Sequence, residues 1–356
     1  MHHTVKHHHT PSVPEFRTDR TASVPAPAGG VPDTTPAVRP ADAHRVQPDD
    51  VLIRDYHRIA ENSYALDIDW AGRHVFFEPA LGSVHHHMLI AQTLRQIGLS
   101  LAHTEFKISS AHQFLMGGMS YSTDPLLPTD LSPVRAEAVC TWTGRNGIRI
   151  AITLEQHGTV FVRSESGFSW VSDRVYRRLR GSHLTARPGA MPAPVGAAAA
   201  GRRAADEVVL GASDRPRRWE LIADTGNPAL MDHPVDHVPG LVIMEASQQA
   251  AHAVVAGAGA RSWCPLTTDM RTSRYVEFDA PCWVDAREVP LPDAPLGSAP
   301  GAGSAARSGR APGSGRAAGS GRAVERIAVE VTGTQHGKVA FRSLVEGLAA
   351  PVAVPE

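Results

Sequence analysis

Apolar residues dominate positions 241–255 so completely that we predict a helix buried on most of its faces. The polar exceptions are Glu245, Gln248, Gln249 and His252. At 100° per residue these four fall on one stripe roughly 100° wide, and we expect this stripe to line a cavity. Pro239 and Gly240 precede the run, and because proline suits a first helical turn, we predict helix entry at 238–240.

The first half of the chain shows a related order of elements. Alternating residues in SYALDIDWAG predict a strand, and the apolar run at about 88–103 predicts a second buried helix. Four strand-like segments follow, namely SAHQFLMGGMSYST, SPVRAEAVCTWTG, IRIAITLEQHG and TVFVRSESGFSW. His157 and Gly158 separate the last two, which predicts a tight hairpin turn between them.

The two halves of the chain align as an internal repeat. The aligned pairs are Gln92 with Glu245, Gln96 with Gln249, and Gln156-His157-Gly158 with Gln335-His336-Gly337. The first two pairs share one offset in residue number, whereas the third has a larger offset, so the second half must contain an insertion. The Gly/Ala/Ser/Arg-rich stretch at about 297–322 has the composition of such an inserted loop.

A strand, a long buried helix and an antiparallel sheet wrapped around that helix, present twice, make a tandem hotdog fold of the α+β class. We place the first repeat at 49–181 and the second at 207–350, with a Pro/Ala/Gly-rich linker at 182–206. Residues 1–48 are rich in Pro, Ala, Thr and His without periodicity, so we expect a disordered tail.

Composition narrows the class of ligand. The chain of 356 residues has 35 Lys and Arg against 36 Asp and Glu, so it lacks the basic excess that nucleic acid requires. Cys140, Cys264 and Cys282 are scattered, which argues against disulfides and a structural zinc site. Because no run resembles a signal peptide, a membrane span or a nucleotide-binding loop, we expect a cytoplasmic protein without metal, cofactor or membrane contact.

The segment HPVDHVPGLVIMEASQQAA resembles the helix entry of hotdog β-hydroxyacyl-carrier-protein dehydratases, in which the catalytic Glu lies five residues after a Pro-Gly helix start. Gly240 and Glu245 have this spacing. The chain is more similar still to the A-factor biosynthesis (AfsA-like) proteins of streptomycetes. That resemblance covers about residues 45–350, and its most specific part is DHPVDHVPG at 232–240.

The resemblance implies acyl transfer. A β-ketoacyl group would leave its acyl-carrier-protein thioester for the hydroxyl of dihydroxyacetone phosphate, in the first committed step toward a γ-butyrolactone or related furan signal. Glu245 is the candidate base, since burial in an apolar cavity raises the pKa of a carboxyl toward the working pH. The N–H groups of Gly240 and Leu241 are candidates to bind the thioester oxyanion. The alternative role for Glu245 is a satisfied buried carboxylate that joins the repeats.

His233 and His237 are further catalytic candidates, because imidazole exchanges protons near neutral pH. Either one would orient Glu245 or protonate the thiolate leaving group, and the alternative for His237 is a hydrogen bond to loop carbonyls. In hotdog dimers the His and the acid of one site come from opposite subunits. The histidines at 85–87 of the first repeat are therefore alternative partners of Glu245, with His233 then facing Gln92.

The repeats differ where the acid stands. Gln92 occupies the place of Glu245, and since an amide is no general base, we predict one catalytic repeat and one that is degenerate or binds substrate. The substrate-binding candidates are Gln92, Arg95 and Gln249. Arg95 would hold the phosphate of the acceptor bidentately, and its alternative is an ion pair with Asp124 or Asp130.

Four arginines follow the first repeat, at Arg174, Arg177, Arg178 and Arg180. They form either a solvated face near a domain end or a docking patch for an acidic carrier protein. The partners that the family resemblance implies are a β-ketoacyl carrier protein and dihydroxyacetone phosphate. A hotdog dehydratase or thioesterase and a non-catalytic acyl-binding regulator stay open as alternatives. Acyl chain length, the butyrolactone or furan end product, and formation of a homodimer are not fixed by the sequence.

Overall fold

The computed structural model describes residues 38–70, 74–77, 87–124, 133–257, 259, 261–292 and 324–352. The strands of the first repeat are β1 (Ile53–Ala60), β2 (Ser63–Ile68), β3 (His112–Thr123), β4 (Val134–Trp142), β5 (Gly147–Gln156) and β6 (Thr159–Ser172). Its helices are α1 (His87–Thr104) and α2 (Asp173–Arg180). Short 3₁₀ turns are η1 (Pro48–Asp50), η2 (Val75–Phe77), η3 (Gly181–Thr185), η4 (Ala197–Ala200) and η5 (Ala205–Glu207).

The second repeat has the same order of elements. Its strands are β7 (Leu210–Gly211), β8 (Arg218–Leu221), β9 (Arg261–Thr272), β10 (Trp283–Val289), β11 (Glu325–Gln335) and β12 (Lys338–Pro351). Its long helix is α3 (Gly240–Val255), which begins where the Pro-Gly pair predicts. No helix in the described ranges is long and apolar enough to cross a membrane.

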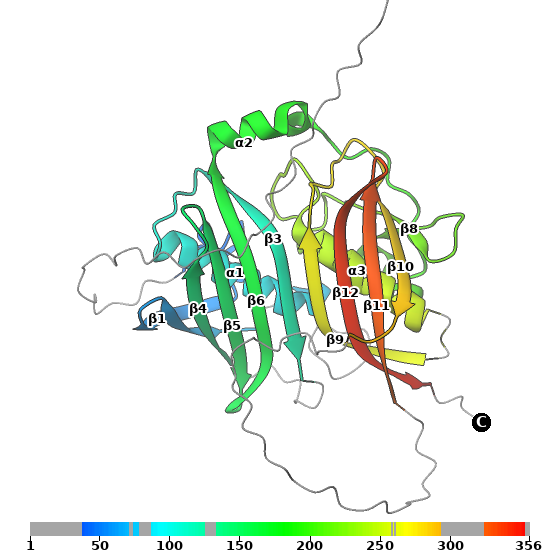
Figure 1. Ribbon diagram of the computed structural model, residues 1–356, viewed down its shortest axis with the longest axis horizontal. Helices are drawn as coiled ribbons and strands as arrows, with labels where there is room; N and C mark the ends of the chain where they lie inside the picture. The colour runs from blue at the N-terminus through cyan, green and yellow to red at the C-terminus, as the bar shows by residue number, and fades with distance from the viewer. Residues whose placement is uncertain are drawn as a thin grey trace, which may run out of the picture.

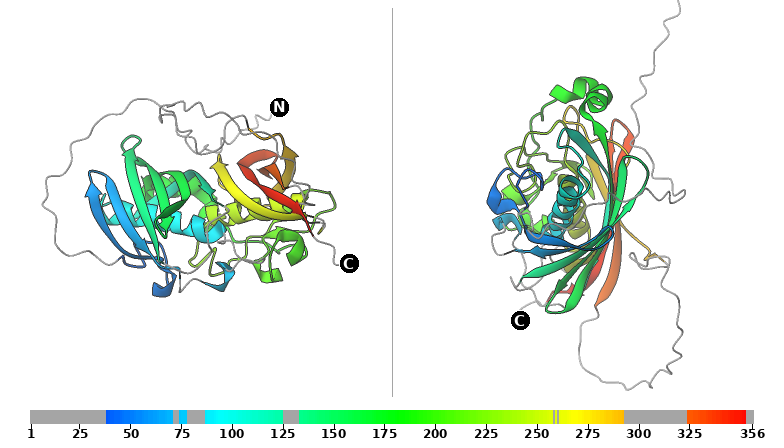
Figure 2. Two further views of the ribbon diagram at one scale, coloured as in Figure 1. Left: turned by 90° about the horizontal axis from the view of Figure 1, so that it is seen from below. Right: turned by 90° about the vertical axis from the view of Figure 1, so that its left-hand side faces the viewer.

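The described strands form one antiparallel sheet in the order β1-β2-β4-β5-β6-β3-β9-β12-β11-β10-β8-β7. The second half of this order is the mirror image of the first, with β3 paired to β9 at the centre. The sheet curves around α1 and α3 (Figures 1 and 2), so each half wraps one long helix. The predicted tandem hotdog fold is therefore confirmed.

Two glutamines show the repeat at the level of single hydrogen bonds. Gln96 accepts a hydrogen bond from Leu52 N and donates one to the carbonyl two residues earlier, both at 2.8 Å. Gln249 does the same around Val209, at 2.9 Å and 2.8 Å. Each long helix thus satisfies the backbone of the segment that leads into the first strand of its own repeat.

The two predicted His-Gly turns also match. His157 and Gly158 have φ of 52° and 76°, and His336 and Gly337 have φ of 51° and 71°. Two successive residues in the left-handed region give the turn twist that a two-residue hairpin needs. The turns join β5 to β6 and β11 to β12, as expected from the alignment of the two halves.

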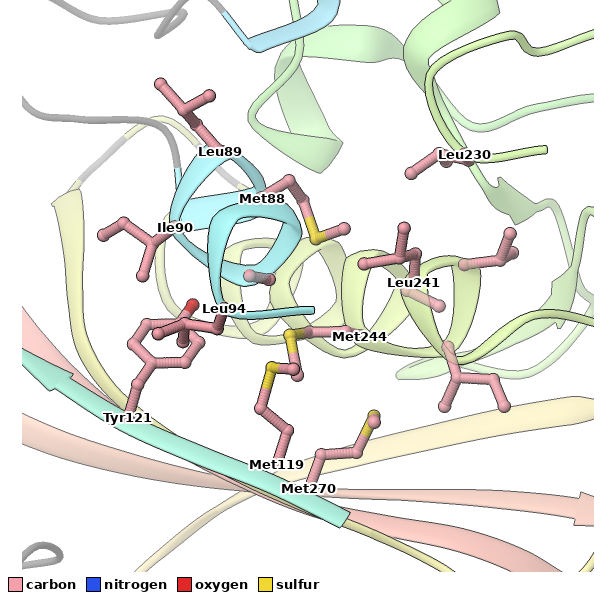
Figure 3. Packing of buried hydrophobic residues seen from close by; sticks show 14 of the residues in the cluster. Met88, Leu89, Ile90, Leu94, Met119, Tyr121, Leu230, Leu241, Met244 and Met270 are labelled. Carbon is pink, nitrogen blue, oxygen red and sulfur yellow. The ribbon is translucent and has the colours of Figure 1, made fainter. Parts of the chain in front are cut away.

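The core lies between the two long helices and the concave face of the sheet. Figure 3 shows Met88 and Leu94 of α1, Met244 of α3, and Met119 and Met270 of the central strands gathered there. Met119 and Met270 are directly paired across the β3–β9 junction. Because methionine is unbranched and flexible, these side chains fill an irregular space where the two repeats meet.

The expected disorder of the N-terminal tail is wrong for residues 38–48, which fold against the second repeat. Arg45 is only 6% exposed and forms ion pairs with Asp50 at 2.9 Å and Asp232 at 3.3 Å. These ion pairs help to offset the conformational entropy that residues 38–48 lose on folding, and the composition of the segment does not predict them. The remainder of the tail and the predicted insertion at 297–322 lie outside the described residues.

Candidate active site

The start of α3 is shaped by Gly240. A Cβ atom at this position would lie 2.0 Å from Cε of Met116, so any other residue would require the flexible end of this β3 side chain to move. Pro239 is the N-cap with extended backbone angles, and it enters the helix without a capping side chain. The first N–H groups of a helix have no intrahelical acceptor, so those of Gly240 and Leu241 are available to a ligand.

A cavity of about 250 Å³ opens at this helix start, lined by residues of both repeats. Its apolar wall includes Leu94, Leu99, Met116, Met119, Phe168, Leu241 and Met244. Its polar lining includes His44, Arg45, Arg95, Asp232, His233, His237, Arg274 and Tyr275. A mostly apolar cavity with a few convergent polar groups is the usual form of a small-molecule site.

Both histidines of the DHPVDH segment line this cavity, and each is held by the aspartate before it. Nδ1 of His233 lies 2.7 Å from Oδ1 of Asp232, and Nδ1 of His237 lies 2.7 Å from Oδ1 of Asp236. The side chains of His233 and His237 are 37% and 27% exposed, so they mark the solvent side of the cavity. A carboxylate on Nδ1 fixes the tautomer that offers Nε2 as proton acceptor.

The two aspartates are themselves held by cations. Burial raises the pKa of Asp232, but the hydrogen bond to His233 and the charge of Arg45 bring it below its usual value. The pKa of Asp236 is also lowered, because hydrogen bonds from His237, Tyr176 and Arg180 outweigh its burial. Both carboxylates therefore stay ionised and able to stabilise an imidazolium.

Arg180 is the cation that organises the second pair. Its Nε donates to Asp236 Oδ2 at 2.8 Å, and its two terminal nitrogens donate to the carboxylate oxygens of Glu277 at 2.6 Å each. The guanidinium also lies over the ring of Tyr275, 4.3 Å from its centroid. Arg180 is only 2% exposed, so its expected place in a solvated arginine face is wrong. Its ion pairs with Asp236 and Glu277 stabilise the guanidinium in this buried position.

Arg95 also lines the cavity, as the expected role in phosphate binding requires. Its Nη1 is buried without a hydrogen-bond partner among the described residues, and it forms no ion pair there with Asp124. The other expected acid, Asp130, lies outside the described ranges. Burial foremost, and then the charge of Arg45, lower the pKa of Arg95 to about 10. An anion in the cavity would relieve both effects.

Glu245 does not line this cavity. It is fully buried, and Oε1 accepts hydrogen bonds from Nε of Arg202 at 2.6 Å and from Gln249 at 2.5 Å. Its other oxygen, Oε2, lies 3.0 Å from Nε2 of His87. The expected partner among the histidines at 85–87 is therefore found, whereas the apolar surroundings expected for this carboxylate are not.

Burial is the largest cause that lowers the pKa of His87, and it outweighs the raising effect of Glu245. The imidazole is therefore neutral near pH 7, and its contact with Glu245 is a hydrogen bond rather than an ion pair. The ion pair of Glu245 is with Arg202, whose side chain is 7% exposed. Arg202 belongs to the predicted linker, which thus packs against α3.

The two remaining candidates, Gln249 and Gln92, are not among the residues that line the cavity. The amide of Gln249 is fully engaged by Val209, Glu207 and Glu245, so the expected contact with substrate is not available to it. Gln92 is 1% exposed, and neither of its amide atoms has a hydrogen-bond partner in the described part of the chain.

Sequence reasoning missed His44, Arg45 and Arg202. They stand in Pro/Ala-rich segments that have no periodicity, so no local pattern marks them. The spacing of Asp232-His233 and Asp236-His237, in contrast, repeats one dipeptide four residues apart and was a readable signal for two Asp–His pairs. The cavity residues of the described chain include no cysteine, so the residues seen there offer no thiol nucleophile.

The mirrored half-sheets, each wrapped around one long helix, define a tandem hotdog protein. The family model of the A-factor biosynthesis hotdog domain matches residues 29–172 and 184–286, more than half of the chain. The chain therefore belongs to the A-factor biosynthesis hotdog family.

Among the relatives is a 2-oxo-3-(phosphooxy)propyl 3-oxoalkanoate synthase from Streptomyces virginiae, 38% identical over 70% of this chain and 87% of its own. A synthase of the same name from Streptomyces griseus is 28% identical over 85% of this chain and 93% of its own. A solved 12:0-ACP thioesterase from Umbellularia californica has a TM-score of 0.47 at 11% identity, covering 82% of this chain and 99% of its own.

Proposed function

We propose that this protein moves a β-ketoacyl group from an acyl-carrier-protein thioester to the hydroxyl of dihydroxyacetone phosphate. Membership of the family and the printed names of the relatives support an acyltransferase of A-factor-type butyrolactone biosynthesis. The name of those synthases describes an ester between a 3-oxo acid and a phosphorylated dihydroxyacetone unit. The carrier protein as acyl donor is an extension of that name.

The observation that carries the proposal is the cavity at the start of α3. It combines an apolar wall for an acyl chain with two Asp–His pairs, two N–H groups at a helix start and a guanidinium whose Nη1 has no partner among the described residues. The reaction needs these four parts: a place for the chain, proton transfer, oxyanion binding and phosphate binding. They meet in one space of about 250 Å³.

The acyl chain is proposed to lie against the apolar wall, with the thioester carbonyl at the N–H groups of Gly240 and Leu241. When the acceptor oxygen adds to this carbonyl, the negative charge forms at the positive end of the α3 dipole. Gly240 lets the acyl chain approach the helix start, because it has no side chain to fill the space next to Met116.

His233 is the proposed general base. Its Nδ1 is engaged by Asp232, so Nε2 is left to take the proton of the acceptor hydroxyl as the new ester bond forms. The C–S bond of the tetrahedral intermediate then breaks, and the departing thiolate takes up a proton from His237 in its protonated form. Exchange with solvent then removes the proton from His233 and returns one to His237, so that both histidines are restored. Asp236 stabilises the charged form of His237, as Asp232 does for His233.

Arg95 is the proposed phosphate ligand. A guanidinium offers paired donors that match a phosphate, and Arg95 has a buried nitrogen for which the described residues offer no acceptor. Arg45 lies close enough to lower the pKa of Arg95, but its own charge is compensated by Asp50 and Asp232. Of these two arginines, it is therefore Arg95 whose positive charge is not compensated by an acid among the described residues.

A second arrangement places the reaction at the start of α1, with Glu245 and His87 as the acid–base pair. The 3.0 Å contact between Glu245 and His87 favours it, since the two come from opposite repeats as in hotdog dimers. Against it, the carboxylate is fully buried and already paired with Arg202. We therefore assign Glu245 to the joining of the two repeats.

Purified protein would be incubated with a β-ketoacyl thioester and dihydroxyacetone phosphate, and the products followed by mass spectrometry. The expected product is the phosphorylated ester, with release of free thiol. Free β-keto acid alone would identify a thioesterase, an enoyl product a dehydratase, and tight binding without turnover a regulator. Each of these three results would overturn the proposal.

A further inference from the structure

The helix α2 lies at the outer end of β6, apart from the two central helices (Figure 1). Ser172 caps its start by accepting a hydrogen bond from Val175 N, and Gly181 ends it with φ of 53°. In eight residues it presents two very different faces. One is buried against the cavity-lining segment 232–240, and the other faces solvent.

The buried face fixes α2 to the candidate site. The hydroxyl of Tyr176 donates to Asp236 Oδ1 at 2.6 Å, and Arg180 donates to both Asp236 and Glu277. Asp236 in turn holds His237, which lines the cavity. The helix is therefore anchored one hydrogen bond away from a proposed catalytic residue.

The solvent face combines apolar and cationic side chains. Val175 is 46% exposed and Leu179 is 38% exposed, and as an i,i+4 pair they are neighbours on the helix surface. Arg174, Arg177 and Arg178 flank them and are exposed as well. Asp173 pairs with Arg177 at 2.7 Å, but neither Arg174 nor Arg178 forms an ion pair within the described residues.

This surface is cationic although the whole chain has a formal net charge of −1. The neighbouring acids Asp236 and Glu277 do not neutralise it, because both are paired with the buried Arg180. An apolar centre with a charged rim is the usual build of a protein–protein contact, in which the rim charges steer association. The complementary partner therefore has an acidic surface with an apolar patch.

We propose that the solvent face of α2 docks an acidic acyl-carrier protein, which then delivers its thioester to the cavity beside His237. This rests on the proposed function, because only a carrier-bound donor needs a docking surface at the cavity. An eight-residue helix offers too little apolar area for stable membrane anchoring. Three exposed arginines are likewise few for nucleic acid binding by counterion release.

The test compares two donors with the same β-ketoacyl group, one on an acidic carrier protein and one on a small soluble thiol such as N-acetylcysteamine. The docking variant is R174E/R178E, and a second variant, V175S/L179S, removes the apolar centre. The matched control is R163E/R215E, which makes the same charge change at two exposed arginines away from α2. Thermal unfolding checks that all variants remain folded.

With the carrier-bound donor at low salt, R174E/R178E should lower kcat/KM by about tenfold or more, and the loss should shrink as ionic strength rises. With the small thioester, kcat/KM should stay within about twofold of wild type, as it should for the control with both donors. V175S/L179S should weaken carrier binding in a fluorescence anisotropy titration, with less dependence on salt.

Equal losses with both donors would overturn the docking proposal, since α2 would then act only through His237. Unchanged kinetics with the carrier-bound donor would overturn it as well. It would also be overturned if the α2 variants lost binding to lipid vesicles or nucleic acid while their kinetics with the carrier-bound donor stayed the same. Failure of wild type to transfer from either donor would instead overturn the proposed function.

Discussion

The starts of α3 and α1 are equivalent positions in a duplicated fold, yet they have become opposites. At the start of α3 a cavity of about 250 Å³ is lined by two Asp–His pairs and by Arg95, whose Nη1 has no partner among the described residues. At the start of α1 His87 meets a fully buried Glu245 whose charge is matched by Arg202. The region at the start of α3 has polar groups around an open cavity, whereas the polar groups at the start of α1 are paired with one another.

We infer from this difference that the two equivalent positions of the duplicated fold have diverged, one toward ligand binding and the other toward joining the repeats. The hydrogen bonds of Gln96 and Gln249 to the backbone are preserved in both repeats, so the shared scaffold has been kept. In the first repeat, Gln92 occupies the position that Glu245 has in the second repeat. The start of α1 therefore has a carboxylate next to it, whereas the residue equivalent to that carboxylate for the start of α3 is an amide. In the proposed mechanism, proton transfer at the cavity is carried out by His233 and His237, each of which is hydrogen-bonded to its own aspartate.

The largest effect that would test the comparison is expected for His233→Gln. Removal of the proposed base should lower kcat by about 10²- to 10⁴-fold, because general acid–base catalysis contributes that much. The folded state should be unaffected, since the His233 side chain is 37% exposed. Steady-state kinetics with a small thioester donor measure the loss, and His157→Asn in the β5–β6 turn serves as control. Activity within tenfold of wild type would remove His233 from the mechanism.

Glu245→Gln should instead act on stability. The substitution leaves the buried charge of Arg202 without its counter-charge, which costs about 3 kcal/mol in unfolding free energy. Urea unfolding measures this cost, and the double variant Glu245→Gln/Arg202→Met should recover part of it. Transfer by the folded fraction should remain within about threefold of wild type. A stable variant that has lost transfer would move the reaction to the start of α1 and reverse the comparison.

The scaffold of both regions was readable from the sequence, because it depends on periodic patterns. The helix start at Gly240, the His157-Gly158 turn and the register of Gln96 with Gln249 each follow from spacing along one segment. The contact of Glu245 with His87 was readable only as an alternative, since it joins two repeats. Local rules do not choose between partners that are distant in sequence.

The distinction between an open and a closed region was not readable. It depends on Arg202 in the linker and on Arg45 in the tail, each of which reaches a carboxylate far away in the chain. The composition of both segments predicts irregular structure, but it does not predict that a single arginine in each segment contacts a distant carboxylate. For the same reason Arg180 was grouped with its exposed neighbours although it is buried between two acids.

Arg95→Met sharpens the comparison by removing the guanidinium from the cavity without adding a charge. The KM for dihydroxyacetone phosphate should rise roughly 10- to 100-fold, because hydrogen bonds to a charged group contribute about 1.5–3 kcal/mol. The kinetics with unphosphorylated dihydroxyacetone should change little. Arg274→Met is the matched variant, because Arg274 also lines the cavity and forms no ion pair among the described residues. If only Arg274→Met raises the KM, the phosphate lies on that side of the cavity.

The smallest effect concerns acid stability, for which each region has one partly buried histidine. Burial is the main cause that lowers the pKa of His44, beside the cavity, to about 3 and the pKa of His252, near Arg202, to about 4. In the unfolded chain each returns to about 6.5, so between these values the unfolded state binds more protons. The unfolding free energy should therefore be highest above pH 6.5 and fall as the pH decreases toward 4.

His44→Gln should remove the contribution of His44 to the pH dependence of the unfolding free energy. The unfolding free energy of the variant should therefore fall less steeply than that of wild type between pH 6.5 and 4. At most this difference amounts to about 1.4 kcal/mol per pH unit, and partial exposure of the ring reduces it. Urea unfolding at a series of pH values measures it, and His57→Gln, at an exposed histidine of β1, should leave the slope unchanged. A slope identical to wild type in His44→Gln would mean that His44 is protonated as readily in the folded state as in the unfolded chain.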